Sequence, residues 1–385
     1  MVRAPTLRMP LHVVLPLLIA LLALGSVTLV TLLFYAHADR TVRSLADQSL
    51  GQIHDRIEDR LREYFEIAER VSRVNRETIE MGRWDRHDLA SWRGAFYEQV
   101  RGFETISSIL WGDVFGGAVF VSRYPGEQGY RFGVRIPSID PRASEYRLSG
   151  EGQLADKPMT VYDYDPRSRP WYLAAIEAQK PVWGGIYTWV PKENMEPVLS
   201  VPFVAPVFGG SGEMLGVFDV EFSLHDLGRF LNSLTIGHTG LAYVMDQDGL
   251  LIASSVGAPV VNTSTGKRLR AQQSSHPLIA ASAPGIGARF MEDGSMAGRV
   301  SSLIEVDGND VMVMATPFNR AGHLRWLAVT LVPADDFLEQ IKSARNLGLM
   351  VAVIAALASA GIGVRFASSV GRPDPGHQTH GADNP

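Results

Sequence analysis

Residues 162–172 read Tyr-Asp-Tyr-Asp-Pro-Arg-Ser-Arg-Pro-Trp-Tyr, and this stretch decides how the rest of the chain is interpreted. Its first residues end a predicted strand, 159–164, and its last residues begin a short predicted helix, 171–178. Asp165-Pro166 is typical of a turn. Pro170 suits the first helical position, where the missing N–H removes no hydrogen bond of the helix. The sequence therefore predicts a strand, a tight turn and a helix in immediate succession.

The same stretch offers groups that hold an anion. A helix N-terminus carries free N–H groups, and the planar guanidinium of Arg169 beside it matches a carboxylate. Tyr164, Trp171 and Tyr172 would supply flat walls with polar rims. We therefore expect a site for a small acid. The alternative is a packed corner whose arginine pairs with an acid of a neighbouring loop, and spacing alone leaves both readings open.

Composition limits the class of protein. The chain has 385 residues, of which 46% are hydrophobic and 20% charged, so it can build a substantial core over two or three domains. Its net charge of -5 argues against a nucleic-acid partner, and the lack of cysteine excludes disulfides. We find no phosphate loop, nucleophile elbow, paired catalytic carboxylates or zinc spacing. The sequence therefore predicts no enzyme, no cofactor and no metal site.

Two apolar runs, Val13–Tyr35 and Asn346–Val364, are each long enough to cross a hydrocarbon core of about 30 Å as a helix. We expect transmembrane helices at 13–35 and 344–364, with residues 1–12 and a short disordered tail, 365–385, in the cytoplasm. Arginines beside both runs favour this orientation. Residues 36–343 would then lie outside the bacterial inner membrane. The alternative for the first run is a signal peptide cleaved near Ala36-His37-Ala38.

Between the two runs the apolar period changes along the chain. Residues 36–82 predict a long stalk helix with one apolar stripe, and 85–101 predict a second helix. A period of two then predicts strands at 106–110, 117–122, 130–135, 159–164, 185–189, 198–207 and 214–222, before a helix at 224–234. A second series follows at 241–246, 250–254, 302–306, 311–317 and 326–332. The expected fold class is α+β, with a membrane-distal module at 83–234 and a membrane-proximal module at 235–343.

This pattern resembles the double Cache (dCache) family of extracytoplasmic sensor domains, which are built from two PAS-like antiparallel-sheet modules. The resemblance covers roughly residues 39–340. It rests on the flanking apolar runs, the long helix, residues 165–172 and the strand Gly216-Val217-Phe218-Asp219-Val220. It is closest in character to the sensor half of bacterial Cache-containing adenylate/guanylate cyclases.

The resemblance implies a ligand site in the membrane-distal module. In the amino-acid-binding branch of the family, the matching positions of this chain are Tyr164, Arg169, Trp171, Tyr172, Tyr187 and Asp219. Arg169 would bind the ligand carboxylate, and Asp219 would bind its ammonium. Trp189 departs from the pattern, because some members carry a further acid there. The implied function is a membrane-anchored sensor for an amino acid or small carboxylate that signals across the membrane.

Three points stay open at the level of sequence. The chain could be the sensor half of a truncated or split nucleotide cyclase or receptor. It could also be a ligand-free membrane scaffold that pairs with full-length receptors. Small residues at Ala352, Ala356, Ala360 and Gly363 share one face of the second apolar run, which predicts a homodimer through close helix packing.

Overall fold

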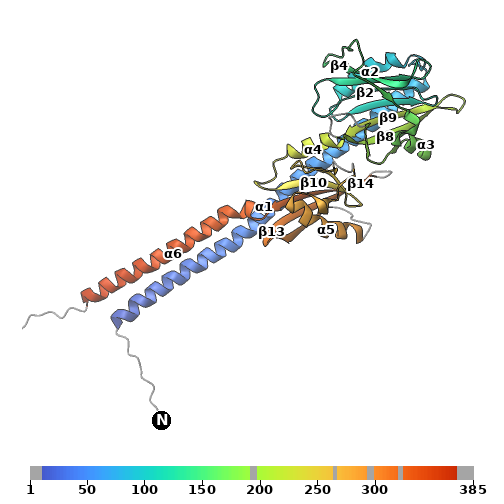
Figure 1. Ribbon diagram of the computed structural model, residues 1–385. Helices are drawn as coiled ribbons and strands as arrows, with labels where there is room; N and C mark the ends of the chain where they lie inside the picture. Colours follow the sequence, from blue (N-terminus) through green and yellow to red (C-terminus); the bar gives the residue numbers. More distant parts are fainter. Residues whose placement is uncertain (1–10, 191–196, 263–266, 293–298, 320–323, 371–385) are drawn as a thin grey trace, which may run out of the picture. The chain divides into compact units, whose positions relative to one another are not determined.

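The computed structural model describes residues 11–190, 197–262, 267–292, 299–319 and 324–370 (Figure 1). The chain divides into two compact units. Met1–Asp47 and Asp335–Pro385 form the first, and Gln48–Ala334 form the second. The second unit holds both sheets and the candidate site. Residues 1–10 and 371–385, for which we expect cytoplasmic ends, lie outside the described residues.

The described residues of the first unit are helical. Helix α1 (Leu11–Glu80) is continuous, so the expected first span and the expected stalk are one element. Helix α6 (Asp335–Val370) continues six residues beyond the predicted end at residue 364. The two helices approach closely at Gly348, where a Cβ would lie 3.2 Å from the Thr31 side chain.

The prediction of two membrane spans gains no support from this helical unit. Among the residues that the structure describes, no helix combines the length and the apolar composition needed to cross a membrane. Helix nevertheless occupies both predicted ranges, 13–35 and 344–364. The structure therefore confirms the helices but not their placement in a bilayer.

The larger sheet of the second unit is antiparallel and has nine strands in the order β5-β4-β3-β2-β1-β9-β8-β6, with β7 also paired to β8. Its strands are β1 (Ser108–Asp113), β2 (Ala118–Ser122), β3 (Tyr130–Ile136), β4 (Asp140–Leu148), β5 (Thr160–Asp163), β6 (Val182–Trp183), β7 (Tyr187–Thr188), β8 (Leu199–Phe208) and β9 (Met214–Ser223). Strand β9 lies in the middle of the sheet, between β1 and β8. Side chains of β9 therefore reach two covered faces.

Helices cover the two faces of this sheet differently. On one face, Phe218 packs against Phe96 of α2 (Arg93–Gly102), and Phe222 packs against Tyr64 of α1. On the other face, Val204 and Val217 pack against α3 (Pro170–Ala178). Because strand side chains alternate in direction, the odd-numbered residues of β9 lie on the α3 side. This alternation brings Asp219 and Glu221 to one face.

The smaller sheet is also antiparallel, with strand order β11-β10-β14-β13-β12. Its strands are β10 (Leu241–Asp246), β11 (Leu251–Ser254), β12 (Val300–Val306), β13 (Asn309–Asn319) and β14 (Arg325–Pro333). Helix α4 (Leu224–Asn232) precedes it. Helix α5 (Pro277–Glu292) packs on its core through Ile279, Ala283 and Ile286. The fold class predicted from the sequence, α+β with antiparallel sheets and a long N-terminal helix, is confirmed.

A single α1 side chain joins the cores of the two sheets. The fully buried ring of Phe65 lies 4.6 Å from Trp183 and 5.6 Å from Phe222 of the larger sheet. The same ring lies 5.1 Å from Phe318 and 5.7 Å from Trp326 of the smaller sheet. The two sheets and the second half of α1 therefore share one aromatic cluster.

Candidate functional site

The turn between β5 and α3 is fixed by its own side chains. The Asp165 carboxylate accepts a hydrogen bond from the Arg167 backbone N–H at 3.0 Å, and it pairs with the Arg167 guanidinium at 2.7 Å. Pro170 occupies the first helical position of α3, as expected. The alternative of an arginine paired with a nearby acid therefore describes Arg167. It does not describe Arg169.

The turn rests directly on β1 at Gly112. A Cβ at Gly112 would lie 2.8 Å from Cβ of Pro166 and 2.9 Å from the Trp171 ring. These distances are shorter than a real Cβ contact, so only glycine lets the turn approach so closely. This close approach positions Arg169 and Trp171 over the α3-facing side of the larger sheet.

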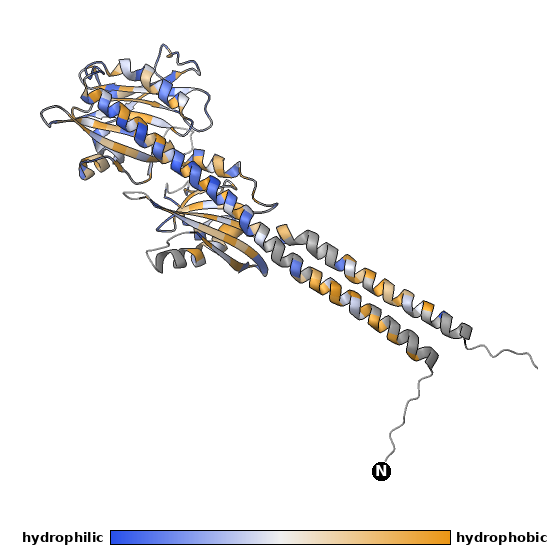
Figure 2. Ribbon diagram, turned by 180° about the vertical axis from the view of Figure 1, so that it is seen from behind, coloured by the Kyte–Doolittle hydropathy of each residue, from blue (hydrophilic) through white to orange (hydrophobic). Residues whose placement is uncertain are grey.

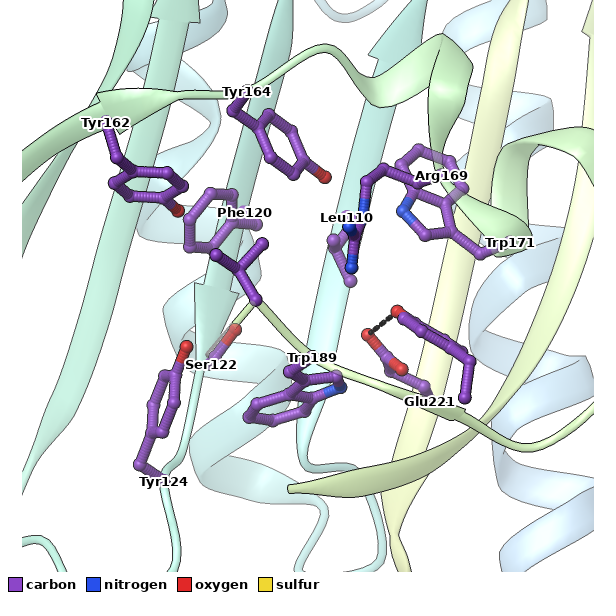
Figure 3. Close-up of a pocket in the computed structure, with 12 residues that line it drawn as sticks. Leu110, Phe120, Ser122, Tyr124, Tyr162, Tyr164, Arg169, Trp171, Trp189 and Glu221 are labelled. Carbon is purple, nitrogen blue, oxygen red and sulfur yellow. Dashed lines mark hydrogen bonds between the residues drawn. The ribbon is translucent and has the colours of Figure 1, made fainter. Parts of the chain in front are cut away.

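A small pocket lies in front of this turn (Figure 3). Its volume is about 40 Å³. It is lined by Leu110, Phe120, Ser122, Tyr124, Tyr162, Tyr164, Arg169, Trp171, Tyr187, Trp189, Val190 and Glu221. The residues come from β1, β2, β5, the turn, α3, β7 and β9, with Tyr124, Trp189 and Val190 in the adjoining loops. The pocket therefore collects side chains from across the sheet.

Arg169 is the cation of this pocket. Its guanidinium donates one hydrogen bond, to the Thr188 carbonyl at 3.3 Å. No carboxylate of the described residues forms an ion pair with it. A guanidinium has five N–H donors, so most of its capacity remains. Figure 3 shows the side chain extending into the pocket, toward the side where Glu221 lies. An anion in the pocket would find an unpaired cation there.

Glu221 is the anion of the pocket and is buried. One carboxylate oxygen accepts a hydrogen bond from the Tyr187 hydroxyl at 3.1 Å, and the other accepts one from the Ser200 hydroxyl. Burial raises the pKa of Glu221 to about 7, while Ser200, Trp189, Tyr187 and the charge of Arg169 act in the opposite direction. A cation beside Glu221 would favour its ionised form.

Asp219 lies two residues earlier on the same face of β9 but does not line the pocket. It is fully buried, and neither carboxylate oxygen has a hydrogen-bond partner in the structure. Burial, and then the charge of Glu221, raise the pKa of Asp219 well above its ordinary value. Burial therefore favours the neutral form of this carboxyl. The role that the sequence assigned to Asp219 fits Glu221 better.

The other predicted site residues divide between the pocket and the core. Tyr164, Trp171 and Tyr187 line the pocket together with Arg169. Tyr172 instead packs in the core between α3 and the sheet, with Val204 and Val217. Sequence reasoning missed Phe120, Tyr124, Tyr162 and Glu221 as lining residues. The period of two in β9 was the available signal for Glu221, because it places residues 219 and 221 on one face.

Metal binding finds no support in the described ranges, where no group of three or more His, Asp or Glu side chains is placed to hold an ion. Asp246, at the end of β10, accepts hydrogen bonds from the backbone N–H groups of Asp248 and Leu250. It also pairs with Arg268 at 2.7 Å. Its carboxylate therefore has a structural role.

Chemotaxis proteins and an adenylate cyclase are similar in sequence to this chain. No protein-family model matches it. The methyl-accepting chemotaxis protein PctB of Pseudomonas aeruginosa is 26% identical over 199 residues, which cover 51% of this chain and 27% of PctB. Adenylate cyclase 1 of Rhizobium meliloti is 24% identical over 206 residues, which cover 52% of this chain and 28% of the cyclase. The match therefore spans only about a quarter of the length of these relatives.

Among solved structures, methyl-accepting chemotaxis protein X matches with a TM-score of 0.51 and 15% identity, over 76% of this chain and 99% of that one. The ligand-binding domain of Mlp24, solved with asparagine, matches with a TM-score of 0.44 and 17% identity, over 79% of this chain and 99% of that one. Because the sequence identity to these structures is 15–17%, the similarity shows the fold alone.

Proposed function

We propose, from the premise that this chain has the fold of a double Cache sensor domain, that its larger-sheet pocket binds a small zwitterionic ligand of the α-amino acid class. Chemoreceptor ligand-binding domains share the fold and have been solved with asparagine, L-serine and L-arginine. The proposal for this chain rests on its own pocket.

The observation that carries the proposal is a cation and an acid that line one cavity without forming an ion pair with each other. Arg169 and Glu221 line the same small cavity and are not joined by an ion pair. Placing charged groups in a confined, aromatic-walled cavity is costly unless each finds a partner. An α-amino acid brings a carboxylate for Arg169 and an ammonium for Glu221 in one molecule. Binding would therefore satisfy both groups at once.

The test is ligand binding by the purified full chain against a panel of amino acids, followed by titration calorimetry of each hit. A ligand at 100 times its dissociation constant adds about 2.7 kcal/mol of stability, which is visible as a rise in melting temperature. We expect Arg169→Ala and Glu221→Gln to abolish the shift.

Arg167→Ala is the matched control. Arg167 is only two residues from Arg169, but it is exposed and paired with Asp165. We expect this variant to bind normally. Equal loss in both arginine variants would indicate a general disturbance of the turn. Normal affinity in Arg169→Ala would refute the site. A folded wild-type chain with no ligand in the panel would favour the ligand-free scaffold.

We further propose that the chain is anchored in the bacterial inner membrane, with residues 36–343 outside. Apolar side chains are exposed along both helices of the first unit, including Leu21 (65%), Phe34 (65%), Leu357 (69%) and Ile362 (70%). Figure 2 shows apolar residues recurring along these helices. Exposed apolar surface of this extent is unfavourable in water and favourable in hydrocarbon.

The lack of native cysteine makes the topology directly testable. Ile139 is 80% exposed in the larger-sheet half of the second unit, so Ile139→Cys should react with a membrane-impermeant maleimide in intact cells. Ser369→Cys, beyond the second apolar run, should react only after lysis. Protection of both positions, or labelling of both, would contradict the proposed orientation.

The output of the sensor would come from outside the described domains. The relatives extend well beyond the matched region, which supports a role in signal transduction together with a cytoplasmic output domain. A homodimer would provide the symmetric pair of helices that such signalling uses. Ala352, Ala360 and Gly363 of the predicted dimer face lie outside the described side chains, so the homodimer stays a prediction.

A further inference from the structure

A second cavity lies at one end of the larger sheet, apart from the pocket that holds Arg169. Its volume is about 530 Å³, against about 40 Å³ for that pocket, and the two share no lining residue. It lies between residues 86–89, the β1–β2 turn at 113–117, the β3–β4 turn at 136–138 and the β8–β9 hairpin at 213–215. Cavities that bind small organic molecules have volumes of about 300–1,000 Å³. This cavity is therefore large enough for a bicyclic molecule.

Most of the cavity wall is apolar. Phe115, at the tip of the β1–β2 turn, lines it with a side chain that is 81% exposed. Covering an exposed aromatic ring with an apolar ligand is favourable, and a flat ligand can also stack on it. The other large apolar side chains in the wall are Leu89, Val114, Ile136, Pro137, Met214 and Leu215. The wall therefore favours a ligand with a flat, apolar body.

The turn that carries Phe115 is held in place by hydrogen bonds. The Asp113 carboxylate accepts one from the Phe115 backbone N–H at 2.8 Å and one from the Gly117 backbone N–H at 2.7 Å. The Arg135 guanidinium donates a further bond to the Gly116 carbonyl. Because the turn is already fixed, a ligand that packs on Phe115 would not have to order a loop as it binds.

Charges of both signs line the rest of the cavity. Its titratable side chains are Arg86, His87, Asp113 and Glu213. Each acid already has a hydrogen-bond donor, Asp113 in its own turn and Glu213 in the Ser211 hydroxyl. The bond from Ser211 and, to a smaller extent, the charge of Arg86 lower the pKa of Glu213. A charged ligand would meet a like charge in this wall whichever sign it carried, and confining a charge without a partner is costly.

We propose that this cavity binds an uncharged aromatic molecule, packed against Phe115 and the apolar side chains of the wall. The site is separate from the pocket proposed to bind an amino acid. It differs from that pocket in size, in lining residues and in the charge of the ligand that it favours. The proposal therefore stands or falls independently of the proposed function.

The test is calorimetry of the full chain at neutral pH with three naphthalene probes: naphthylmethanol, naphthoate and naphthylmethylamine, all substituted at the same ring position. The ring is constant in this series and only the charge changes. We expect the uncharged alcohol to bind at least tenfold more tightly than either ion. The proposal is overturned if none of the three binds, or if either ion binds as tightly as the alcohol.

Three variants locate the bound probe. Phe115→Ala removes an exposed ring and should weaken naphthylmethanol binding at least fivefold. Leu173→Ala, at an exposed position of α3 outside the cavity, is the matched control and should bind normally. Arg169→Ala should also bind naphthylmethanol normally. Unchanged affinity in Phe115→Ala would overturn the proposal, and so would loss of naphthylmethanol binding in Arg169→Ala, because the probe would then occupy the other pocket.

Two further variants test the balance of charge, and both change exposed residues. Arg86→Gln removes a positive charge from the wall and should shift selectivity between the two ions toward naphthylmethylamine. Glu213→Gln removes a negative charge, keeps an acceptor for Ser211 and should shift selectivity toward naphthoate. We expect each ratio of affinities to change at least threefold, with little change for the alcohol. A selectivity that neither variant alters would place the probes outside this cavity and overturn the proposal.

Discussion

Glu221 and Phe222 are consecutive residues of β9 whose side chains lie on opposite faces of the larger sheet. The Glu221 carboxylate lines the pocket, while the Phe222 ring lies 4.7 Å from Tyr64 of α1. One peptide unit therefore separates a group that would contact the ligand from a group that contacts the long helix. A shift of β9 on ligand binding would therefore reach α1 directly, through the contact between Phe222 and Tyr64. A ligand could drive such a shift only by binding two states of the strand with different affinities.

Phe65→Ala should strongly destabilise the second unit. The ring is fully buried and contacts rings of both sheets, so its removal leaves a cavity where the two cores meet. Truncation of a buried phenylalanine costs about 3–5 kcal/mol. Urea denaturation of the full chain would measure the loss. Val74→Ala, on an exposed part of the same helix, should change stability by less than about 1 kcal/mol. A small loss of stability in Phe65→Ala would mean that the neighbouring rings move to fill the cavity.

Gly133→Ala should block the pocket without altering any charged group. Gly133 lies opposite Phe120 in the β2–β3 pair, and a Cβ there would overlap the Phe120 ring. The ring, which lines the pocket, would have to move. We expect loss of ligand binding by calorimetry and a stability loss of about 1–3 kcal/mol. Gly94→Ala in α2 is the control, because nothing lies within 4 Å of its added Cβ. Normal binding in Gly133→Ala would show that Phe120 can be displaced away from the ligand.

The elements that could be predicted from the sequence are those with a long apolar run or a clear apolar period. Strands β8 and β9 are long apolar runs and were found within a residue or two. Strand β4 was missed because its sequence, Asp140–Leu148, has proline at its second position and mixes charged with small residues, so no apolar period is visible. Helix α5 was missed because small residues dominate it, and its core contacts, Ile279, Ala283 and Ile286, form only a short stripe.

The residues of the candidate site also divide into those that the sequence predicts and those that it does not. The sequence predicted Tyr164, Arg169 and Trp171, which line the pocket, because turn chemistry and charge are local properties of residues 162–172. The choice between Asp219 and Glu221 depends on which of two same-face positions reaches the cavity, and this is set by packing across the sheet. Leu110 and Val204 flank Asp219 on the neighbouring strands and belong to the core beneath α3. No local pattern in the sequence distinguishes the two acids.

Asp219→Asn should stabilise the protein above about pH 5. The pKa of Asp219 is raised well above its ordinary value in the folded state, chiefly by burial. The unfolded chain therefore releases this proton as pH rises past about 4, while the folded chain holds it, so the native residue loses stability with rising pH. Asparagine has no proton to lose. The expected gain is on the order of 1–3 kcal/mol at pH 7 and near zero at pH 3.5, measured by urea denaturation. Asp163→Asn, at an exposed position of β5, should show no such gain at either pH.

Ligand affinity should fall as pH decreases through about 7. Burial raises the pKa of Glu221 to about 7, so acid converts the group that would bind the ammonium into a neutral carboxyl. Well below that pKa, the dissociation constant should increase by about tenfold per pH unit if only the ionised form binds. Calorimetry between pH 5 and 8.5 would measure the slope. A residual affinity in Glu221→Gln that follows the same slope would assign the titration to another group.

His54→Leu should protect the fold against mild acid. His54 is buried on α1, and burial, followed by the charge of Arg299, lowers its pKa from 6.5 to about 4. The unfolded chain takes up a proton at this residue below pH 6.5, and the folded chain does so only near pH 4. The stabilising contribution is therefore fully present above pH 6.5 and is lost as pH falls toward 4, by about 3 kcal/mol in total. Leucine cannot be protonated, so the variant should lose less stability than the wild type between pH 7 and pH 4.5. Urea denaturation at the two pH values measures the difference, with His87→Leu, at an exposed position, as the control. Parallel losses in the wild type and His54→Leu would place the acid sensitivity elsewhere, whereas a reduced loss confined to His54→Leu would establish this histidine as the group through which protonation loosens α1 from the smaller sheet.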